Sequence, residues 1–570
     1  WRVKVFTTKG ESDWSIIQEW NVGLLTESDW QGQWIGYDRT NPGDVEDVHS
    51  RLSSRYLRTE FALDEAAVTR ATLYICGLGL YEAYINGKKV GADVLTPSPT
   101  DYRRTVLYNA YDVTAMLQKD NALGVVLGNG RYYTMQQKKK PYKITNFGYP
   151  TLRANLIIEY ADGKRKTIST NEKTWQLSCN GPLRSNNEYD GEIYDARLES
   201  DWTLPDFDAS SWQKAERTAI PYGTLRGSMQ QQMRELAAWS PKELKKIGDK
   251  YIVDFGQNLS GWVNLNISNT QEGDTIQIRY AEKLDSTGTQ LWVANLRNAQ
   301  STDRYIANGK EQNRSWHAIF SYHGFRYVEV SGLKNLTAAD INARLVADNL
   351  NDVGFISTKD TIFNKVFHNA KFGVIENYKG MPVDCPQRDE RQPWLGDHTV
   401  GCLGESFLFD NSNLYTKWVR NICESQREDG CIPDVAPAYW NYYSDNMTWP
   451  AALPFSLEML YEQYGDIAPV QKNYPNVKKW MEHMKEQYGK DGLITKDKYG
   501  DWCVPPEKQE LIHSQDPTRI TDGTLISTAY YYRLCLWMQK YAKMFGYEHD
   551  AADYARQAAE TKAAFNKKFL

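Results

Sequence analysis

The sequence lacks the patterns that mark several large classes of protein. Its formal net charge is −5 and its acidic and basic residues are interspersed, so no basic stripe is available to replace the counterions of a nucleic acid. No apolar run approaches the length of a membrane span, and the mean hydropathy is −0.63. The eight cysteines form no CxxC pair, and no two of the eight histidines have metal-ligand spacing. We therefore expect no nucleic-acid partner, no membrane span, no metal and no disulfide framework.

Aromatic residues, by contrast, are abundant. The chain has 19 Trp and 37 Tyr among 570 residues, and aromatic residues make up 13% of it. Such rings either fill large β-sandwich cores or stack on the apolar faces of sugar rings. For any single Trp, a place in a core is the favoured interpretation. Three or four domains are expected at this length, so one chain has room for both uses.

The segment 384–397 concentrates more chemistry than any other stretch. It reads Asp-Cys-Pro-Gln-Arg-Asp-Glu-Arg-Gln-Pro-Trp-Leu-Gly-Asp. Its two prolines and one glycine favour a fixed, non-helical path. Carboxylates crowded beside arginines and an aromatic wall are typical of general acid catalysis on sugars. A structural salt-bridge corner is the alternative, and the spacing taken alone favours that alternative.

This segment resembles the signature of bacterial α-L-rhamnosidases of glycoside hydrolase family 78, which reads Asp-Cys-Pro-x-Arg-Asp-Glu-Arg-x-x-Trp-x-Gly-Asp. Every fixed position of the signature is met here. The resemblance implies that Glu390 is the general acid. It also implies that the sugar is contacted by Asp384, Arg388, Trp394 and Asp397. One departure is a proline where a Gly usually precedes the Trp. Because proline fixes only its own φ and removes one N–H, we expect a small local change.

From Trp1 to about residue 350 the chain is predicted to be β. Runs such as Tyr81–Ile85 and Leu152–Tyr160 are rich in β-branched and aromatic residues, and turn signals separate them. Asn86-Gly87 and Asp162-Gly163 are expected to be hairpin turns, because both dipeptides accept positive φ. Short strands at such intervals indicate β-sandwiches or jelly rolls.

After residue 352 the pattern changes to the 3.6-residue period of helices. Seven helices are predicted, near 358–378, 396–408, 412–427, 450–464, 475–488, 522–545 and 549–569. Ser357 is the expected N-cap of the first helix. The apolar stripe of the sixth helix is expected at Leu525, Ala529, Tyr532 and Leu536.

These patterns divide the chain into four parts. Residues 1–49 are interpreted as the end of a truncated β-domain plus a linker, 50–215 as an N-terminal jelly-roll module, and 235–347 as a second β-sandwich module. Residues 352–570 resemble the N-terminal part of an (α/α)6 toroid, the family's catalytic domain of six helical hairpins. The resemblance implies that about five helices are missing. It also implies that the general base, unassigned here, lies beyond Leu570.

Loops elsewhere hold weaker candidates. The resemblance implies that Asp501 and Trp502 supply an acid and a Trp wall to the sugar pocket. Trp449 is a further candidate for that pocket, although packing is the favoured role for it. In the first module, Asp101–Arg103 and Asn129 could form a sugar or Ca²⁺ site, as in some relatives, but scaffold turns are the favoured explanation.

The resemblance leads to an expected function. We expect inverting hydrolysis of terminal non-reducing α-L-rhamnose from a plant polysaccharide or glycoside, with a rhamnose-containing oligo- or polysaccharide as partner and without a cofactor. Apolar surroundings such as Trp394 are expected to raise the pKa of Glu390 and keep it protonated. Two alternatives stay open: a six-hairpin exo-glycosidase or lyase for another sugar, and a non-catalytic carbohydrate-binding protein. The expected location is periplasmic or secreted, with the cytoplasm as the alternative.

Overall fold

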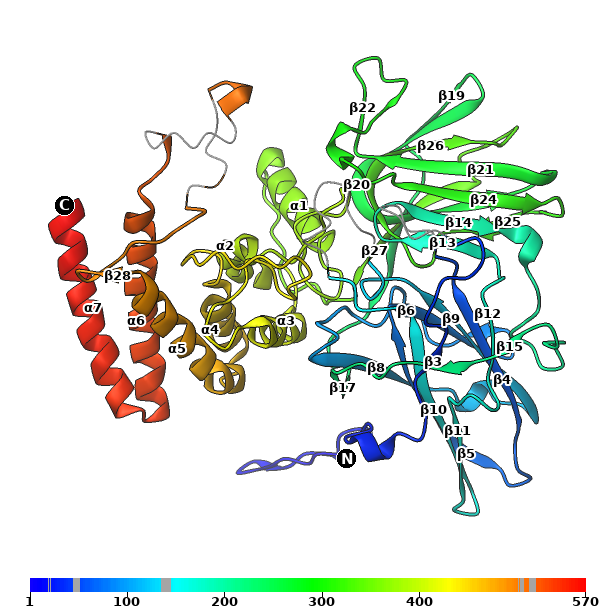
Figure 1. Ribbon diagram of the computed structural model, residues 1–570, viewed down its shortest axis with the longest axis horizontal. Helices are drawn as coiled ribbons and strands as arrows, with labels where there is room; N and C mark the ends of the chain where they lie inside the picture. The colour runs from blue at the N-terminus through cyan, green and yellow to red at the C-terminus, as the bar shows by residue number, and fades with distance from the viewer. Residues whose placement is uncertain are drawn as a thin grey trace.

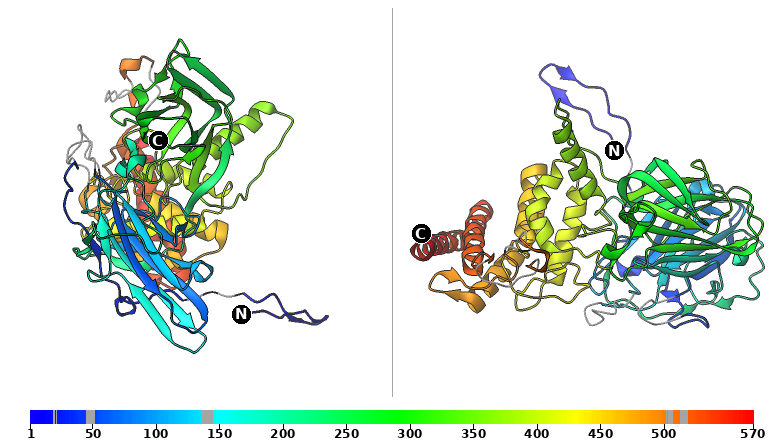
Figure 2. Two further views of the ribbon diagram at one scale, coloured as in Figure 1. Left: turned by 90° about the vertical axis from the view of Figure 1, so that its right-hand side faces the viewer. Right: turned by 90° about the horizontal axis from the view of Figure 1, so that it is seen from above.

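The computed structural model describes residues 1–18, 20, 22–44, 52–134, 145–500, 502, 507–511 and 519–570. Two β units lie next to each other at one end of the molecule, and the helices extend from them toward the other end (Figure 1). Helices α6 (Gly523–Phe545) and α7 (Glu548–Phe569) lie farthest from the sheets (Figure 1 and the right-hand view of Figure 2). Sheet-rich units followed by a helical domain are what the sequence predicted, and the fold class is confirmed.

The first β unit is a sandwich of two sheets. One has the strand order β16-β3-β10-β5-β8-β17, with β11 paired to β10, and the other has the order β15-β12-β4-β9-β6-β7. The strands are β3 (Ile35–Gly36), β4 (Arg55–Ala62), β5 (Val68–Leu78), β6 (Leu80–Ile85), β7 (Lys88–Lys89), β8 (Thr105–Asp112), β9 (Asp120–Gly128), β10 (Thr151–Tyr160), β11 (Arg165–Ser169), β12 (Gln176–Ser178), β15 (Gln213–Lys214), β16 (Glu216–Arg217) and β17 (Thr224–Gly227). Fully buried side chains such as Ile75, Leu123 and Trp175 fill the space between the sheets.

The second β unit is built on one ten-stranded sheet of order β13-β14-β24-β21-β26-β20-β27-β18, with β19 and β25 paired to β20. The strands are β13 (Leu183–Asn187), β14 (Gly191–Asp195), β18 (Met233–Trp239), β19 (Glu243–Ile247), β20 (Lys250–Ile267), β21 (Glu272–Ala281), β24 (Thr302–Asn308), β25 (Arg314–Trp316), β26 (His323–Ser331) and β27 (Ile341–Asp348). The small pair β22 (Lys283–Leu284) and β23 (Leu291–Trp292) lies beside it. The long β20 is irregular between Asp254 and Leu259, where Gly256 has a φ of 76°.

The hairpin predictions are confirmed. Asn86 and Gly87, with φ of 51° and 79°, join β6 to β7, and Gly163, with φ of 83°, lies in the turn from β10 to β11. Positive φ at both central residues is the geometry of the type I′ turn, for which Asn-Gly is the preferred sequence.

Two stretches lie in different units from those predicted. Ile35 and Gly36, assigned to the segment 1–49, form β3 and pair with β10 and β16 of the first sandwich. Residues 183–195, assigned to the module 50–215, form β13 and β14, and β14 runs parallel to β24 of the second unit. Such non-local pairings depend on the approach of distant strands, which local patterns do not encode. Residues 1–18 form a mostly exposed arm around the short strands β1 (Phe6–Thr7) and β2 (Gly10–Glu11), and the arm stands away from the rest of the chain (Figure 2).

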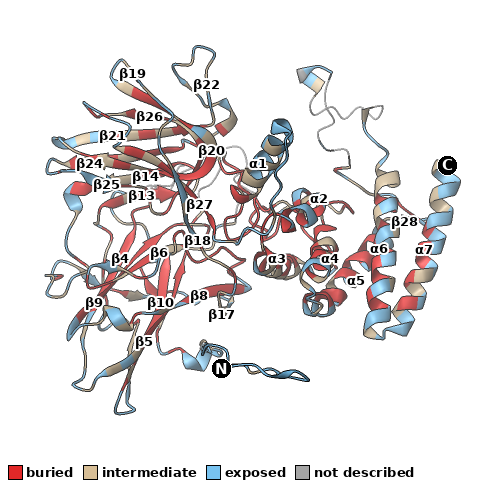
Figure 3. Ribbon diagram, turned by 180° about the vertical axis from the view of Figure 1, so that it is seen from behind, coloured by how far each residue is buried: buried red, intermediate tan, exposed pale blue. Residues whose placement is uncertain are grey.

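The described residues contain seven α-helices, at positions close to the predicted ones. The first five are α1 (Thr361–Ile375), α2 (Leu395–Ser406), α3 (Ser412–Ser425), α4 (Ala452–Tyr464) and α5 (Ala468–Tyr488), followed by α6 and α7. A short pair of strands, β28 (Gly489–Lys490) and β29 (Leu493–Ile494), follows α5. One core of buried side chains runs from the second β unit through the helices (Figure 3). No helix among the described residues has the length and apolar character that crossing a membrane requires.

Three details of the helices were predicted wrongly. Helix α5 begins seven residues before the predicted start at 475, with Pro469 in its first turn, where a missing N–H costs nothing. The stripe at Leu525, Ala529, Tyr532 and Leu536 is not the buried face of α6; that face is formed by Ser527, Tyr531, Leu534 and Met538, among others. Helix α6 carries apolar residues on most of its circumference, so periodicity alone does not select the packed face.

The third wrong prediction is the N-cap of α1, which is Asp360 and not Ser357. Asp360 Oδ1 accepts hydrogen bonds from the N–H groups of Ile362 (2.8 Å) and Phe363 (3.2 Å). These are two of the first-turn donors that have no partner within the helix. Ser357 lies too far before the first turn to reach them.

The two candidate caps can be compared directly. Replacement Asp360→Ala should destabilise the first turn of α1 by about 1 kcal/mol, which corresponds to roughly fivefold faster amide hydrogen exchange there. Replacement Ser357→Ala is the matched control and should leave exchange in α1 unchanged. Equal effects of the two replacements would contradict the assignment of the cap.

Candidate active site

The carboxylates of segment 384–397 are held in a loop that leads directly into α2. The Asp384 N–H donates to Gln392 O (3.0 Å), and the Gln392 N–H donates back to Asp384 Oδ1 (2.7 Å). The loop therefore folds onto itself just before the helix. Leu395, the first residue of α2, donates its N–H to Asp434 O (3.0 Å), which joins the helix start to the loop between α3 and α4. The path is non-helical up to Trp394, as its prolines predicted.

Arg391 fastens this loop to both β units. Its side chain is fully buried, and its guanidinium donates to Tyr322 O (2.8 Å), Glu188 O and Arg388 O (3.2 Å). The guanidinium also lies over the Tyr322 ring, 4.6 Å from its centroid. Arg131 of the first unit donates to the Arg391 carbonyl. A buried charge is tolerated only with such compensation, so Arg391 is a structural anchor.

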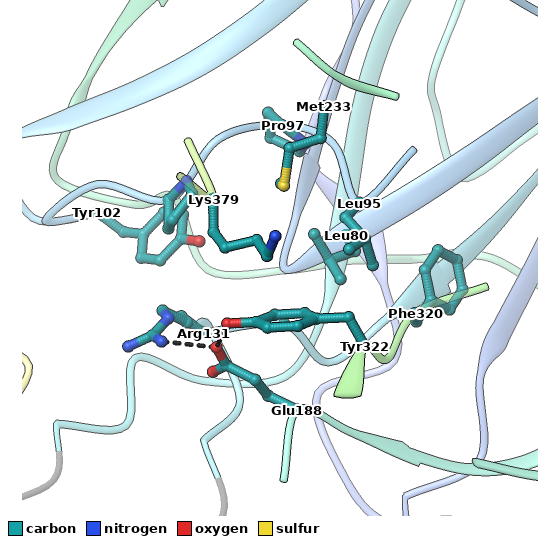
Figure 4. A pocket seen from close by; sticks show the side chains of 12 residues that line it. Leu80, Leu95, Pro97, Tyr102, Arg131, Glu188, Met233, Phe320, Tyr322 and Lys379 are labelled. Atoms are coloured by element: carbon teal, nitrogen blue, oxygen red, sulfur yellow. Dashed lines mark hydrogen bonds and ion pairs between the residues drawn. The ribbon is translucent and has the colours of Figure 1, made fainter. Parts of the chain in front are cut away.

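Three parts of the chain meet at a small cavity next to this anchor. The cavity has a volume of about 40 Å³ and is lined mainly by apolar side chains (Figure 4). On its polar side the Glu188 carboxylate accepts hydrogen bonds from Arg131 (2.6 Å) and from the Tyr322 hydroxyl (3.1 Å). Lys379, which follows α1, extends into it from the helical domain (Figure 4). The cavity thus marks where the β units and the helices join.

Arg388 links the two acids that the sequence singled out. Its Nη2 donates to Asp384 Oδ2 (2.6 Å), and its Nε donates to Glu390 Oε2 (2.9 Å). The Trp394 indole N–H donates to the other oxygen, Glu390 Oε1 (2.9 Å). The side chain of Asp384 is 5% exposed and that of Glu390 is 11% exposed. The structure therefore brings Asp384, Arg388, Glu390 and Trp394 into one group.

A second arginine reaches Glu390 from the second β unit. Arg297 follows the short 3-10 helix η5 (Ala294–Leu296), and its guanidinium forms an ion pair with Glu390 Oε2. Its backbone has a φ of 58°, a conformation that is uncommon for a residue other than glycine. The adjacent Asn298 donates to Asp389 Oδ2 (2.8 Å). One loop of a β unit thus contacts both acids of the Arg-Asp-Glu sequence, which the sequence analysis did not foresee.

These contacts reverse the predicted protonation of Glu390. Burial raises the pKa of this carboxyl, but Arg388, Arg297 and the Trp394 N–H stabilise its charged form and hold the pKa below its usual value. Trp394 was expected to raise the pKa; it lowers it, because its polar N–H and not its ring edge meets the carboxylate. Burial and the neighbouring charge of Glu390 raise the pKa of Asp384 to about 7. In this arrangement, therefore, Asp384 and not Glu390 is the acid that titrates near neutral pH.

Aromatic rings from three segments form a wall beside Trp394. Tyr442 stacks on Trp394 at a centroid distance of 6.0 Å, and Tyr499 meets it edge-on at 6.5 Å. Tyr499 also stacks on Trp449 at 4.2 Å and contacts Trp502 at 5.4 Å. Trp502 is 57% exposed, so part of its side chain is accessible to a ligand. The wall joins the three predicted tryptophans through Tyr499, which the sequence analysis missed.

The Trp-Leu-Gly-Asp sequence requires a glycine at position 396 for a steric reason. A Cβ at Gly396 would lie 2.2 Å from the indole of Trp449. Trp449 is half-buried and packs on the backbone of α2 at this point. Packing, the favoured role for Trp449, is therefore present, and the ring is also part of the aromatic wall.

The remaining predicted site residues divide into three groups. Asp397 lies in the first turn of α2 and is exposed, so its carboxylate is accessible to a ligand. Asp501 lies outside the described residues. In the first module Tyr102 and Asn129 are buried, and the Asp101 carboxylate is bound by Arg103 at 2.8 and 2.9 Å. These contacts are those of a scaffold turn.

Three family models match the chain. The α-L-rhamnosidase N-terminal domain matches residues 66–237, the bacterial α-L-rhamnosidase concanavalin-like domain residues 245–347, and the bacterial α-L-rhamnosidase 6 hairpin glycosidase domain residues 351–570. An α-L-rhamnosidase of Formosa agariphila is 33% identical, with 100% of this chain and 63% of the relative covered.

Solved structures agree. The α-L-rhamnosidase from Dictyoglumus thermophilum is 34% identical with a TM-score of 0.91, covering 100% of this chain and 63% of that one. The Streptomyces avermitilis α-L-rhamnosidase complexed with L-rhamnose is 31% identical with a TM-score of 0.82. The match covers 91% of this chain and 49% of that one. The chain thus spans about 63% of the length of the Formosa relative. Models of three α-L-rhamnosidase domains match consecutive parts of the chain, and relatives align along its whole length. The chain therefore belongs to the bacterial α-L-rhamnosidase family.

Proposed function

We propose that the protein hydrolyses terminal non-reducing α-L-rhamnose from rhamnose-containing oligo- or polysaccharides. One observation carries the proposal: Glu390 is held by two arginines and an indole N–H at the edge of an aromatic wall. This arrangement places a carboxyl group beside a surface on which a sugar ring can stack. The relatives named above, one of them in complex with L-rhamnose, support rhamnose as the sugar.

Glu390 is proposed as the group that protonates the glycosidic oxygen. Its carboxylate is charged while Arg297 and Arg388 both contact it. To donate a proton to the glycosidic oxygen, Glu390 must therefore become protonated when a sugar binds. A sugar stacked on Trp394 excludes water from Glu390, and this further desolvation raises the pKa of the carboxyl. Arg297 has a side chain that is 40% exposed and can be displaced by the ligand. Asp384, whose pKa is raised to about 7, is proposed to contact a sugar hydroxyl together with Asp397.

An inverting course is part of the proposal. Inversion requires a second carboxylate across the sugar ring, roughly 6.5–9.5 Å from the acid, to activate a water molecule. Glu405 is not suited to that role, because Tyr378, Tyr415 and His398 bind both of its oxygens inside the core. We propose that a second carboxylate, unassigned here, activates the water molecule.

Replacement of the proposed acid tests its role. In the natural protein, Glu390→Gln should reduce turnover of unactivated rhamnosides by roughly 10²–10⁴-fold, the usual contribution of a positioned acid. Aryl rhamnosides with good leaving groups need less protonation and should lose much less. The exposed Glu428, in the loop between α3 and α4, provides the control Glu428→Gln, which should leave both rates unchanged. An equal loss on both substrates would remove Glu390 from the role of donor.

The effect of Arg297 on the acid can be read from pH profiles. Replacement Arg297→Met removes a cation that stabilises the Glu390 carboxylate, so the pKa of Glu390 should rise. Because the acid is active only when protonated, the basic limb of kcat/KM should move to higher pH. Arg297→Lys keeps the charge and should shift the limb less. A basic limb that stays in place in Arg297→Met would show that Glu390 does not set it.

Stereochemistry and substrate choice test the rest of the proposal. Proton NMR of the reaction should show β-L-rhamnose as the first product, since inversion converts the α-glycoside into the β-anomer. Initial α-L-rhamnose would establish retention. Aryl glycosides of fucose, glucose and galacturonic acid should be poor substrates beside the rhamnoside. Preference for one of these sugars would support an exo-glycosidase of other specificity, and binding of rhamnose without any release would support a carbohydrate-binding protein.

A further inference from the structure

Three potential metal ligands that are far apart in the sequence meet beside α5. Cys431 and Asp445 lie in the loop between α3 and α4, and His483 lies in α5. The Cys431 sulfur is 2.8 Å from Asp445 Oδ1, and His483 Nε2 is 3.0 Å from the same oxygen. All three ligand atoms lie within 4.8 Å of one another. Sequence spacing gave no sign of this group, because the three residues belong to no local motif.

The surroundings hold these side chains in place. Cys431 and His483 are buried, whereas the side chain of Asp445 is 21% exposed and gives the group access to solvent. The Tyr488 hydroxyl donates to the second oxygen of Asp445 (2.7 Å) and so orients the carboxylate. Outer contacts of this kind are typical around metal ligands, where they fix the orientation of the binding group.

The backbone supports the same arrangement. Asp445 has a φ of 46°, in the left-handed region that is uncommon for a residue other than glycine. Next to Cys431, a Cβ at Gly430 would lie 2.5 Å from Lys479 O and 3.0 Å from the Cβ of His483. The loop therefore lies directly on α5 where His483 projects.

The chemistry of the three ligands selects the kind of ion. A thiolate, an imidazole and a carboxylate form a mixed set that suits Zn²⁺, whereas Ca²⁺ and Mg²⁺ are bound by oxygen ligands. Zinc bonds of about 2.0–2.3 Å place neighbouring ligand atoms roughly 3.3–3.6 Å apart in a tetrahedron. The two contacts of Asp445 Oδ1, at 2.8 and 3.0 Å, therefore need to lengthen by roughly 0.3–0.8 Å when an ion replaces the protons between the ligands.

We propose that Cys431, Asp445 and His483 form a Zn²⁺ site. Binding releases the thiol proton of Cys431 to solvent and leaves a sulfur–zinc bond, with no change of oxidation state. The ion joins the loop between α3 and α4 to α5. That loop also carries Trp440 and Tyr442, which contact Trp394, so the site braces one side of the aromatic wall. This inference does not rest on the proposed activity.

Metal binding to the purified protein tests the site directly. After treatment with a chelator, the protein should bind one equivalent of Zn²⁺ that resists gel filtration, measured by elemental mass spectrometry. Co²⁺ used as a probe should produce a thiolate-to-cobalt charge-transfer absorption band, which is a property of a Cys–metal bond and needs no enzyme assay. His483→Gln should weaken Zn²⁺ binding at least about tenfold, and Cys431→Ser should also abolish the band.

Cys423 provides a matched control. It lies in α3, and its thiol donates to Asn473 of the same helix α5 (3.3 Å), without a histidine or carboxylate in the contact. Cys423→Ser should bind Zn²⁺ and show the cobalt band as the unaltered protein does. No stoichiometric Zn²⁺ and no cobalt band in the unaltered protein would overturn the proposal, whether or not the variants fold. Equal binding by Cys431→Ser and Cys423→Ser would do the same.

Discussion

The site depends on one buried cation. The Arg391 guanidinium donates to backbone carbonyls of the acid-bearing loop and of the second β unit. Arg131 of the first unit in turn donates to the backbone carbonyl of Arg391. Removing such a group would leave buried oxygens without donors, at a cost of about 1–3 kcal/mol for each. Through Arg391, therefore, the two β units as well as the helical domain fix the position of Glu390.

The pKa values of the two acids likewise depend on residues from both the loop and a β unit. Arg388 comes from the loop itself, but Arg297 comes from a β unit almost a hundred residues earlier in the chain. Both lower the pKa of Glu390, while burial and the charge of Glu390 raise that of Asp384. Two carboxyls joined by one arginine thus have pKa values shifted in opposite directions. For Glu390 to donate a proton, its lowered pKa has to rise again when a sugar binds, as proposed above.

The loop between α3 and α4 has two tasks. Near its middle, Trp440 and Tyr442 pack against Trp394 and extend the aromatic wall. At its ends, Cys431 and Asp445 hold it against α5 through His483 and Tyr488. A loop that presents rings to a ligand needs such fixed ends, because its backbone gains little from regular hydrogen bonding.

The sequence by itself determined the order of β units and helices and the hairpin turns, and it selected segment 384–397, with Glu390, as the candidate site. These features reside in local patterns: alternation, 3.6-residue periodicity, turn dipeptides and a contiguous signature. Only the tertiary structure decided that Arg297 reaches Glu390, that Tyr499 links Trp449 to Trp502, and that Cys431 meets His483. It also decided the direction of the Glu390 pKa shift, since a Trp in a sequence does not show whether its ring or its N–H will face a carboxylate. Contacts between distant segments and the electric field that they create arise only when the units pack together.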